Sequence, residues 1–231
     1  AEFPPGEVEI EVEYSSLNYK DALATMGHPG VVRSFPHVPG IDAAGRVVTS
    51  ENNCFKAGDP VLVTGYGLGS DSWGGFSDRI RVPGDWVVPL PSGVTPRQAM
   101  LYGTAGFTAA QAVSALQLHS VTPDLGEVVV TGATGGVGLW SIALLRHLGY
   151  RVAAVTGKLE RHDLLRQLGA SEILDRHEVV DESDRPLLTS RWAGAIDTSG
   201  GRPLATLLRS TAYRGCVAAC GLVAGADLPM T

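Results

Sequence analysis

Glycines cluster in the stretch VVVTGATGGVG, residues 128–138, between a β-branched run and a helical pattern. Ala133, Gly135 and Gly138 occupy the three positions of an A-x-G-x-x-G turn. A turn of this type brings backbone N–H groups close to a pyrophosphate at the positive end of a helix. It therefore predicts dinucleotide binding, although a turn that needs glycine only for its geometry, or a site for S-adenosylmethionine, is also compatible with the pattern. The expected cofactor contacts in the turn are Thr134, Gly135, Gly136 and Val137.

The end of the next strand discriminates between cofactors. An NAD site places Asp or Glu about 20 residues after the glycines, where it binds the ribose 2′-OH. This sequence has Thr156, Gly157 and Lys158 there, and Arg161 follows. A carboxylate would repel a 2′-phosphate, whereas Lys158 and Arg161 would pair with it. The pattern favours NADPH over NADH and over S-adenosylmethionine, whose sites also usually have an acid here; the alternative for Lys158 is a solvated surface lysine.

Two different sequence patterns along the chain indicate the structural elements that position these residues. The first half has short apolar strands separated by turns rich in Gly, Pro, Asp and Asn, which predicts a compact antiparallel β domain over residues 1–102. The second half alternates strands and helices, which predicts an α/β domain with a doubly wound parallel sheet over residues 103–231. The expected strands cover residues 8–12, 44–48, 60–63, 80–82, 86–90, 127–131, 151–155, 172–174, 194–198 and 217–220, and the clearest expected helix covers residues 107–117.

Composition excludes several classes of protein. The net charge is −6 and no basic block is present, so nucleic acid is not an expected partner. No apolar run approaches the roughly 18 residues of a membrane helix, and the three cysteines fit a reducing compartment, so a cytoplasmic protein is expected. The chain starts without Met in a strand pattern and stops just after another, which indicates a fragment, truncated at both ends.

The cysteine and histidine spacing predicts no metal site. Cys54 stands alone, and Cys216 and Cys220 lie in or just beyond an apolar strand, where a buried role is expected. The six histidines show no ligand-like spacing. Polarisation of a substrate carbonyl by zinc is therefore not expected.

Several further stretches, in order, resemble a known family: SLNYKDA, WGGFSD, GTAGFTA, TGATGGVG, WAGAIDT and GCVAACGL. Together they resemble the zinc-independent medium-chain dehydrogenases/reductases of the quinone oxidoreductase branch, most closely the acryloyl-CoA reductase group. The resemblance covers essentially the whole chain and implies a GroES-like catalytic domain followed by a Rossmann domain. Family members extend beyond both ends of this sequence, and the C-terminal extension implies a homodimer when the chain is full length.

The resemblance assigns the stretch LNYKDA to the nicotinamide end of the cofactor. It implies that Asn18 binds the nicotinamide ribose or carboxamide and that Tyr19 lies against the cofactor or supplies a proton. Lys20 and Asp21 would form an ion-paired couple near the substrate. A packed aromatic residue and a surface ion pair are the alternatives for these three side chains.

Three further positions are expected to contact the cofactor. Thr108, near a helix start with Thr104, either caps that helix or meets the cofactor. Arg176, after the third strand of the second half, matches a basic residue that relatives direct toward the adenosine phosphate, and a solvated arginine is the alternative. Leu222 would lie at the carboxyl edge of the sheet, where open α/β folds bind cofactors. For the glycine-rich loop 64–78, the sequence is compatible with a mobile border of the substrate cleft and with an ordinary long turn.

The resemblance implies an NADPH-dependent reductase that transfers a hydride to the β-carbon of a short 2-enoyl-CoA such as acryloyl-CoA. The alternative enzymatic activity is reduction of a quinone or another α,β-unsaturated carbonyl. A noncatalytic NADPH-binding protein is the alternative from another class.

Overall fold

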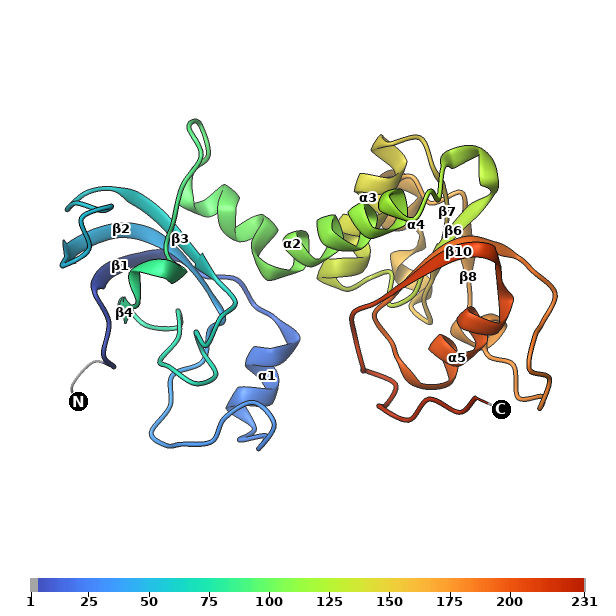
Figure 1. The fold of residues 1–231 in the computed structure, drawn as a ribbon, viewed down its shortest axis with the longest axis horizontal. Helices are drawn as coiled ribbons and strands as arrows, with labels where there is room; N and C mark the ends of the chain where they lie inside the picture. The colour runs from blue at the N-terminus through green and yellow to red at the C-terminus, as the bar shows by residue number, and fades with distance from the viewer. Residues whose placement is uncertain (1–3, 231) are drawn as a thin grey trace. The chain divides into compact units, whose positions relative to one another are not determined.

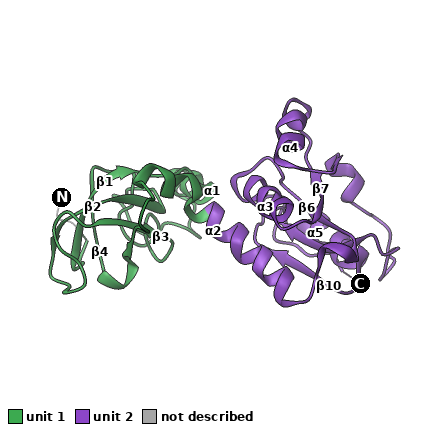
Figure 2. Cartoon of the chain, turned by 90° about the horizontal axis from the view of Figure 1, so that it is seen from above, with its two compact units in different colours: residues 1–104 green, residues 105–231 purple. Residues whose placement is uncertain are grey.

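The computed structural model describes residues 4–230. These residues form two compact units, which divide after Thr104 (Figure 2). The sequence predicts a division after residue 102, and the structure divides after Thr104.

Unit 1 is built on an antiparallel five-stranded sheet with the order β4-β1-β2-β3-β5 (Figure 1). Its side chains alternate between a buried and an outer face, so that Val8, Ile10, Val61 and Val63 enter one apolar core. The strands are β1 (Val8–Tyr14), β2 (Asp42–Ser50), β3 (Pro60–Thr64), β4 (Arg79–Val82) and β5 (Val88–Pro89), with a 3₁₀ turn η1 (Gly84–Trp86) before β5.

A short helix that the sequence pattern does not predict follows β1. Helix α1 (Tyr19–Thr25) begins after Asn18, whose extended backbone marks the N-cap, and Asp21 lies in its first turn. The carboxylate of Asp21 accepts a 2.7 Å hydrogen bond from the N–H of Asn18, as in a capping box. Seven residues are too few to reveal such a helix by periodicity, and the capping residues are its clearest signal.

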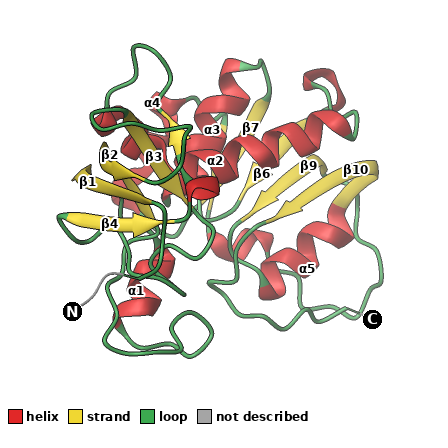
Figure 3. Ribbon diagram, turned by 60° about the vertical axis from the view of Figure 1, so that its left-hand side comes forward, coloured by secondary structure: helices red, strands yellow, loops and turns green. Residues whose placement is uncertain are grey.

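Unit 2 contains a parallel five-stranded sheet with the order β10-β9-β6-β7-β8, as the alternation of strands and helices predicts (Figure 3). The order reverses at β6, so that β7 and β9 flank it. The carboxyl ends of β6 and its neighbours therefore form a topological switch point, where ligands bind in open α/β sheets. The strands are β6 (Glu127–Val130), β7 (Arg151–Val155), β8 (Glu172–Leu174), β9 (Trp192–Asp197) and β10 (Thr211–Ala219).

Helices cover both faces of this sheet. Val128 and Val130 pack into one core with residues of α2 and α3, whereas Val129 packs into the opposite core with Leu207 of α5. The helices are α2 (Pro96–Leu118), α3 (Gly136–His147), α4 (His162–Leu168) and α5 (Gly201–Ser210), with 3₁₀ turns η2 (Pro123–Leu125), η3 (Leu159–Arg161) and η4 (Arg176–Val179).

Helix α2 starts eleven residues before the expected position, at Pro96, and is interrupted at Gly103. Gly103 has φ 50° and ψ −158°, which is not helical. A residue with a side chain would be strained in this conformation. The expected helix over residues 107–117 is the part of α2 that follows this interruption.

Candidate functional site

The glycine turn between β6 and α3 is held by close backbone packing. Gly132 has φ 57°, and a Cβ there would collide with Oγ1 of Thr198. A Cβ at Gly138 would lie 2.5 Å from the carbonyl O of Gly132 and 2.7 Å from Cα of Ala133. The N–H of Ala133 donates a 3.1 Å hydrogen bond to the carbonyl of Val155, which ties the turn to β7. Side chains are thus excluded where the backbone must fold back on itself.

The first turn of α3 has the features of an anion site. Gly135 is the N-cap residue and offers no side chain that could satisfy the first N–H groups of the helix. No acidic residue lies in the first turn. Gly135 and Gly136 are exposed and Val137 is half-buried. The helix start is therefore accessible to a ligand with negative charge.

A cavity of about 340 Å³ adjoins this turn at the carboxyl ends of the strands. It brings together Thr134 of the turn, the end of β7 and Arg176 of η4, although Thr134 and Arg176 are more than 40 residues apart in the sequence. The lining residues are Thr131, Gly132, Thr134, Val155, Thr156, Gly157, Lys158, Arg176, Val179, Ser199, Pro203 and Val223. Five of the residues proposed from the sequence, Thr134, Thr156, Gly157, Lys158 and Arg176, therefore line one cavity.

Two basic side chains stand at the end of β7. Oγ1 of the buried Thr156 accepts a 3.1 Å hydrogen bond from the N–H of Lys158, which fixes the bend after the strand. The guanidinium arm of Arg176 passes over Gly157, since a Cβ on Gly157 would lie 3.5 Å from its Cδ and Nε. Within residues 4–230, neither Lys158 nor Arg176 forms an ion pair with an acidic side chain. Their charges are available to a ligand. Arg161 is exposed but does not line the cavity.

Asp197, at the end of β9, is a buried residue that the sequence analysis did not single out. Its Oδ1 accepts hydrogen bonds from Oγ1 of Thr131 at 2.6 Å and from the N–H of Ser199 at 3.3 Å. Its Oδ2 accepts from the N–H of Gly200 at 2.7 Å. Oγ1 of Thr198 in turn donates to the carbonyl of Thr131 at 3.0 Å. These hydrogen bonds tie the segment after β9 to the glycine turn. The sequence signal for this arrangement is the acid Asp197, followed three and four residues later by Gly200 and Gly201.

In unit 1, the structure gives Asp21 a different environment from the one expected. The carboxylate is fully buried, and its Oδ1 accepts hydrogen bonds from the N–H groups of Gly40 and Ile41 at 3.1 and 2.9 Å. Together with the bond from Asn18, three backbone donors hold it. The expected ion pair with Lys20 is not formed among the described residues, because Asp21 is turned into the protein and Lys20 is exposed. Asp21 positions the backbone around Asn18.

The side chains that stay accessible in this stretch are Tyr19, which is 60% exposed, and Lys20. Asn18 is half-buried, and its amide Nδ2 donates a 2.8 Å hydrogen bond to Oδ2 of Asp42. Asp42, the first residue of β2, is fully buried and was not among the expected site residues.

Two other expected contacts lie outside the cavity lining. Leu222 follows β10 and is 62% exposed, while its neighbour Val223 lines the cavity. Thr108 is half-buried in α2. The structure thus brings neither side chain into the group formed by Thr134, Lys158 and Arg176.

Gly69, Gly74 and Gly75 of loop 64–78 lie where a Cβ would collide with the backbone of residues 39–42. A Cβ at Gly69 would lie 2.6 Å from the carbonyl carbon of Gly40, and a Cβ at Gly40 would lie 2.5 Å from the backbone N of Phe76. His37 Nε2 also lies 2.9 Å from the carbonyl O of Gly69. The loop is packed backbone to backbone against residues 37–42.

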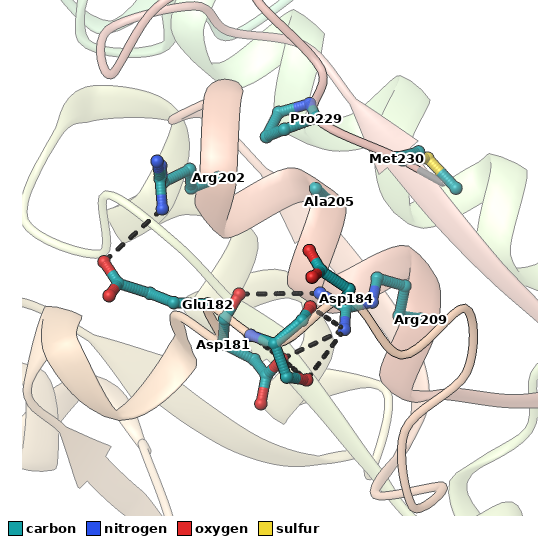
Figure 4. A pocket seen from close by; sticks show the side chains of 9 residues that line it. Asp181, Glu182, Asp184, Arg202, Ala205, Arg209, Pro229 and Met230 are labelled. Carbon is teal, nitrogen blue, oxygen red and sulfur yellow. Dashed lines mark hydrogen bonds and ion pairs between the residues drawn. The ribbon is translucent and has the colours of Figure 1, made fainter.

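A second cavity in unit 2, of about 240 Å³, is lined by acids and two arginines (Figure 4). The buried Arg209 donates hydrogen bonds to Oδ1 of Asp181 at 3.0 Å and to the carbonyl of Arg185 at 2.7 Å, and Arg202 pairs with Glu182 at 3.4 Å. The Ser183 hydroxyl, which donates to Asp181, is the main cause of a lowered pKa of that carboxyl group. The charges on its walls compensate one another, so this cavity lacks the open cationic end of the first.

The described part of the chain holds no candidate metal site and no candidate membrane span. Among residues 4–230, no group of three or more His, Cys, Asp or Glu side chains is placed to hold a metal ion. No helix in the same range has both the length and the apolar character needed to cross a membrane.

The sequence of this chain matches known protein families over both units. Residues 4–92 match the model of the alcohol dehydrogenase GroES-like domain, and residues 136–231 match that of the zinc-binding dehydrogenases. Acrylyl-CoA reductase AcuI of Ruegeria pomeroyi is 51% identical over 230 residues, which cover 100% of this chain and 70% of that protein.

Two crystal structures show the same fold. The yhdH oxidoreductase from Salmonella enterica, in complex with NADP, is 53% identical with a TM-score of 0.95 over 99% of this chain and 70% of that one. Bacillus subtilis yhfP, with NAD bound, is 46% identical with a TM-score of 0.92 over the same shares of the two chains. The chain therefore belongs to the medium-chain dehydrogenase/reductase family, in the group of the acrylyl-CoA reductases and their quinone oxidoreductase-like relatives.

Proposed function

We propose that the protein reduces the C=C bond of a short 2-enoyl-CoA, such as acryloyl-CoA, with NADPH as the hydride donor. The observation that carries the cofactor assignment is the cavity at the end of β7, where Lys158 and Arg176 line the wall without acidic partners in the described chain. The relative named acrylyl-CoA reductase, 51% identical over the whole chain, supports the reaction.

The residues of unit 2 fit a dinucleotide phosphate. A pyrophosphate would take the N–H groups at the start of α3, where a Cβ at Gly138 would collide with the turn. The 2′-phosphate would pair with Lys158 and Arg176. Relatives of this chain include one solved with NADP and one solved with NAD, so the fold alone does not choose the cofactor. The choice depends on the residues at the end of β7.

NADPH, when bound, supplies a hydride to the β-carbon of the activated alkene. The protein then has to stabilise the enolate oxygen of the thioester and provide a proton for the α-carbon. The Tyr19 hydroxyl and the Lys20 ammonium group are exposed donors beside Asn18 and are the groups we propose for these tasks. Asp21 is not proposed as the acid, because three backbone N–H groups occupy its carboxylate oxygens.

An assay of NADPH oxidation with acryloyl-CoA and, separately, with a quinone tests the reaction. We expect consumption of NADPH with acryloyl-CoA and the appearance of propanoyl-CoA, and slower consumption with NADH at equal concentration. Turnover of the quinone alone would identify the alternative enzyme. A chain that binds NADPH but consumes it with neither acceptor would contradict both enzyme assignments.

We also propose that the full-length protein is a cytoplasmic homodimer. Its three cysteines are all unpaired in the structure, which fits a reducing compartment. Sedimentation equilibrium of the protein at several concentrations tests the dimer, and a mass of one chain throughout would contradict it.

A further inference from the structure

The carboxylate of Asp42 accepts four hydrogen bonds in unit 1, all from residues that precede or follow it by more than 20 positions. Its Oδ2 accepts from the Ser16 hydroxyl, from Nδ2 of Asn18 at 2.8 Å and from the N–H of Thr104 at 2.9 Å. Its Oδ1 accepts from Oγ1 of Thr104 at 2.6 Å. The carboxylate is fully buried, so these donors take the place of water.

The carboxylate decides which way the Asn18 amide faces. An ionised carboxylate only accepts hydrogen bonds, so Nδ2 of Asn18 must point to it, and Oδ1 must point elsewhere. The second N–H of Nδ2 has the Ser16 hydroxyl within 3.5 Å. Both donor positions of the amide are therefore directed at the protein. A carbonyl oxygen has two lone pairs, so Oδ1 keeps acceptor capacity even if it takes the N–H of Asp21 in the capping box.

The backbone around the cluster is built to keep it. Gly103 has φ 50°, and a Cβ there would lie 2.6 Å from Oγ of Ser16 and 2.7 Å from Oδ2 of Asp42. The absence of this atom lets the chain pass close to Asp42, so that the N–H of Thr104, the first residue after the interruption of α2, reaches the carboxylate. All of these contacts are made by the protein's own groups, so the Asn18 amide would be preorganised for a ligand.

We propose that Asp42 is a positioning residue that locks the Asn18 side chain with its oxygen as the ligand-facing end. Asn18 then recognises a hydrogen-bond donor, a ribose hydroxyl or a carboxamide N–H, and not an acceptor. This inference rests on the proposed binding of NADPH, whose nicotinamide half carries both kinds of donor. It assigns a task to Asp42, the fully buried acid that opens β2.

The state of the amide can be measured without any cofactor, by NMR of the Asn18 side-chain NH₂ group in the ligand-free protein. We expect one of its two protons to be shifted downfield and to exchange slowly in the wild type, and both features to be lost in Asp42→Ala. In Asp42→Asn, the new amide oxygen can replace Oδ2, and its NH₂ can donate to the Thr104 hydroxyl. This variant should retain the signature of the wild type. An unshifted, rapidly exchanging Asn18 amide in the wild type would overturn the lock.

A double-mutant cycle on the NADPH dissociation constant then separates positioning from general stability. Asn18→Ala should weaken NADPH binding by roughly threefold to tenfold, the usual range for one hydrogen bond. Asp42→Ala should weaken it by a similar factor, Asp42→Asn by less than twofold, and the double variant Asn18→Ala/Asp42→Ala no more than Asn18→Ala alone. Thermal stability should fall in both variants that carry Asp42→Ala.

Equal weakening by Asp42→Ala in the presence and absence of Asn18 would overturn the proposal, because the acid would then act on the fold and not on the amide. A wild-type protein that binds no NADPH would contradict the proposed function instead. In that case the NMR measurement still decides whether Asp42 locks Asn18.

Discussion

Oγ1 of Thr131 donates a 2.6 Å hydrogen bond to Oδ1 of Asp197, which joins the end of β6 to the end of β9 across 66 positions of the sequence. Both side chains are buried, and Thr131 also lines the proposed cofactor cavity. The same hydroxyl accepts a 3.0 Å hydrogen bond from the N–H of Thr198. The pair therefore connects the stability of the sheet edge to the geometry of the binding turn.

Asp197→Ala should lower the free energy of unfolding by about 2–4 kcal/mol, because it leaves the N–H of Gly200 and the Thr131 hydroxyl without their buried acceptor. Thr131→Val, the matched variant that removes only the hydroxyl, should cost about 1–2 kcal/mol. Both should weaken NADPH binding. Urea unfolding monitored by circular dichroism measures the first effect and fluorescence titration the second. If Asp197→Ala lowered the free energy of unfolding less than Thr131→Val, Asp197 would not be the main acceptor that holds this edge of the sheet.

The parts of the fold that follow from local pattern were predictable. The β-branched run before the glycines, and the alternation of strands with helices, indicate the parallel sheet and its binding edge, and the structure shows the sheet with a cavity at that edge. Lys158 could be placed at that edge because the distance from the glycine turn to the end of the next strand is nearly constant in such sheets.

The buried acids could not be assigned in the same way. Asp21, Asp42 and Asp197 are all fully buried, and each is defined by donors that come from distant segments. A sequence pattern records an acid and its neighbours but not which backbone N–H groups fold back onto it. The sequence therefore suggested an ion pair between Asp21 and the adjacent Lys20, whereas the tertiary structure gives the Asp21 carboxylate three backbone N–H donors.

The choice of cofactor should depend on Arg176 more than on Arg161. Arg176 lines the cavity and passes over Gly157, whereas Arg161 does not line it. We expect Lys158→Ala and Arg176→Ala each to weaken NADPH by roughly tenfold and to change NADH affinity by less than twofold, since a charge-assisted pair contributes about 1.5 kcal/mol or more. Arg161→Ala should have the smaller effect on NADPH. Isothermal titration with both cofactors measures these affinities, and equal losses for NADPH and NADH would contradict the assignment of the 2′-phosphate.

Two glycines of the binding turn should respond differently to an added methyl group. Gly138→Ala should destabilise the protein by about 1–3 kcal/mol, because its Cβ would lie 2.5 Å from the carbonyl O of Gly132. Gly135 has φ −82°, and its nearest Cβ contact would be 3.3 Å, to the carbonyl O of Gly132, so Gly135→Ala should lower the melting temperature less than Gly138→Ala does. This variant should nevertheless weaken NADPH, since its methyl group would stand at the exposed start of α3.

Differential scanning fluorimetry with and without NADPH separates the two effects. We expect Gly138→Ala to melt at a lower temperature in both conditions, and Gly135→Ala to lose mainly the stabilisation that NADPH provides. If Gly135→Ala keeps the full shift with NADPH, the turn does not approach the pyrophosphate as proposed.

Cys220 should make the protein less stable at alkaline pH. Cys220 is exposed when the whole residue is considered, but its Sγ lies 3.3 Å from the carbonyl O of the buried Asp197. Burial of the thiol, and secondarily the charge of Asp197, raise the pKa of Cys220 to about 11. The folded state thus holds the thiol proton in a range where the unfolded chain, with a pKa of 9.0, releases it. The free energy of unfolding should therefore fall as the pH rises from 9 to 11.

Chemical denaturation of the wild type and of Cys220→Ala across this pH range measures the contribution of the thiol. The variant should lose part of the alkaline slope, and the remainder comes from Cys216 and Tyr150, whose pKa values burial also raises. Cys54→Ala, which removes an exposed thiol of unit 1, is the matched control against which the slope of Cys220→Ala is compared. At pH 8, iodoacetamide should modify Cys54 before Cys220, because only a thiolate reacts and Cys220 is almost fully protonated there. An alkaline slope that is identical in Cys220→Ala and in the wild type would show that Sγ is not held against Asp197 in solution.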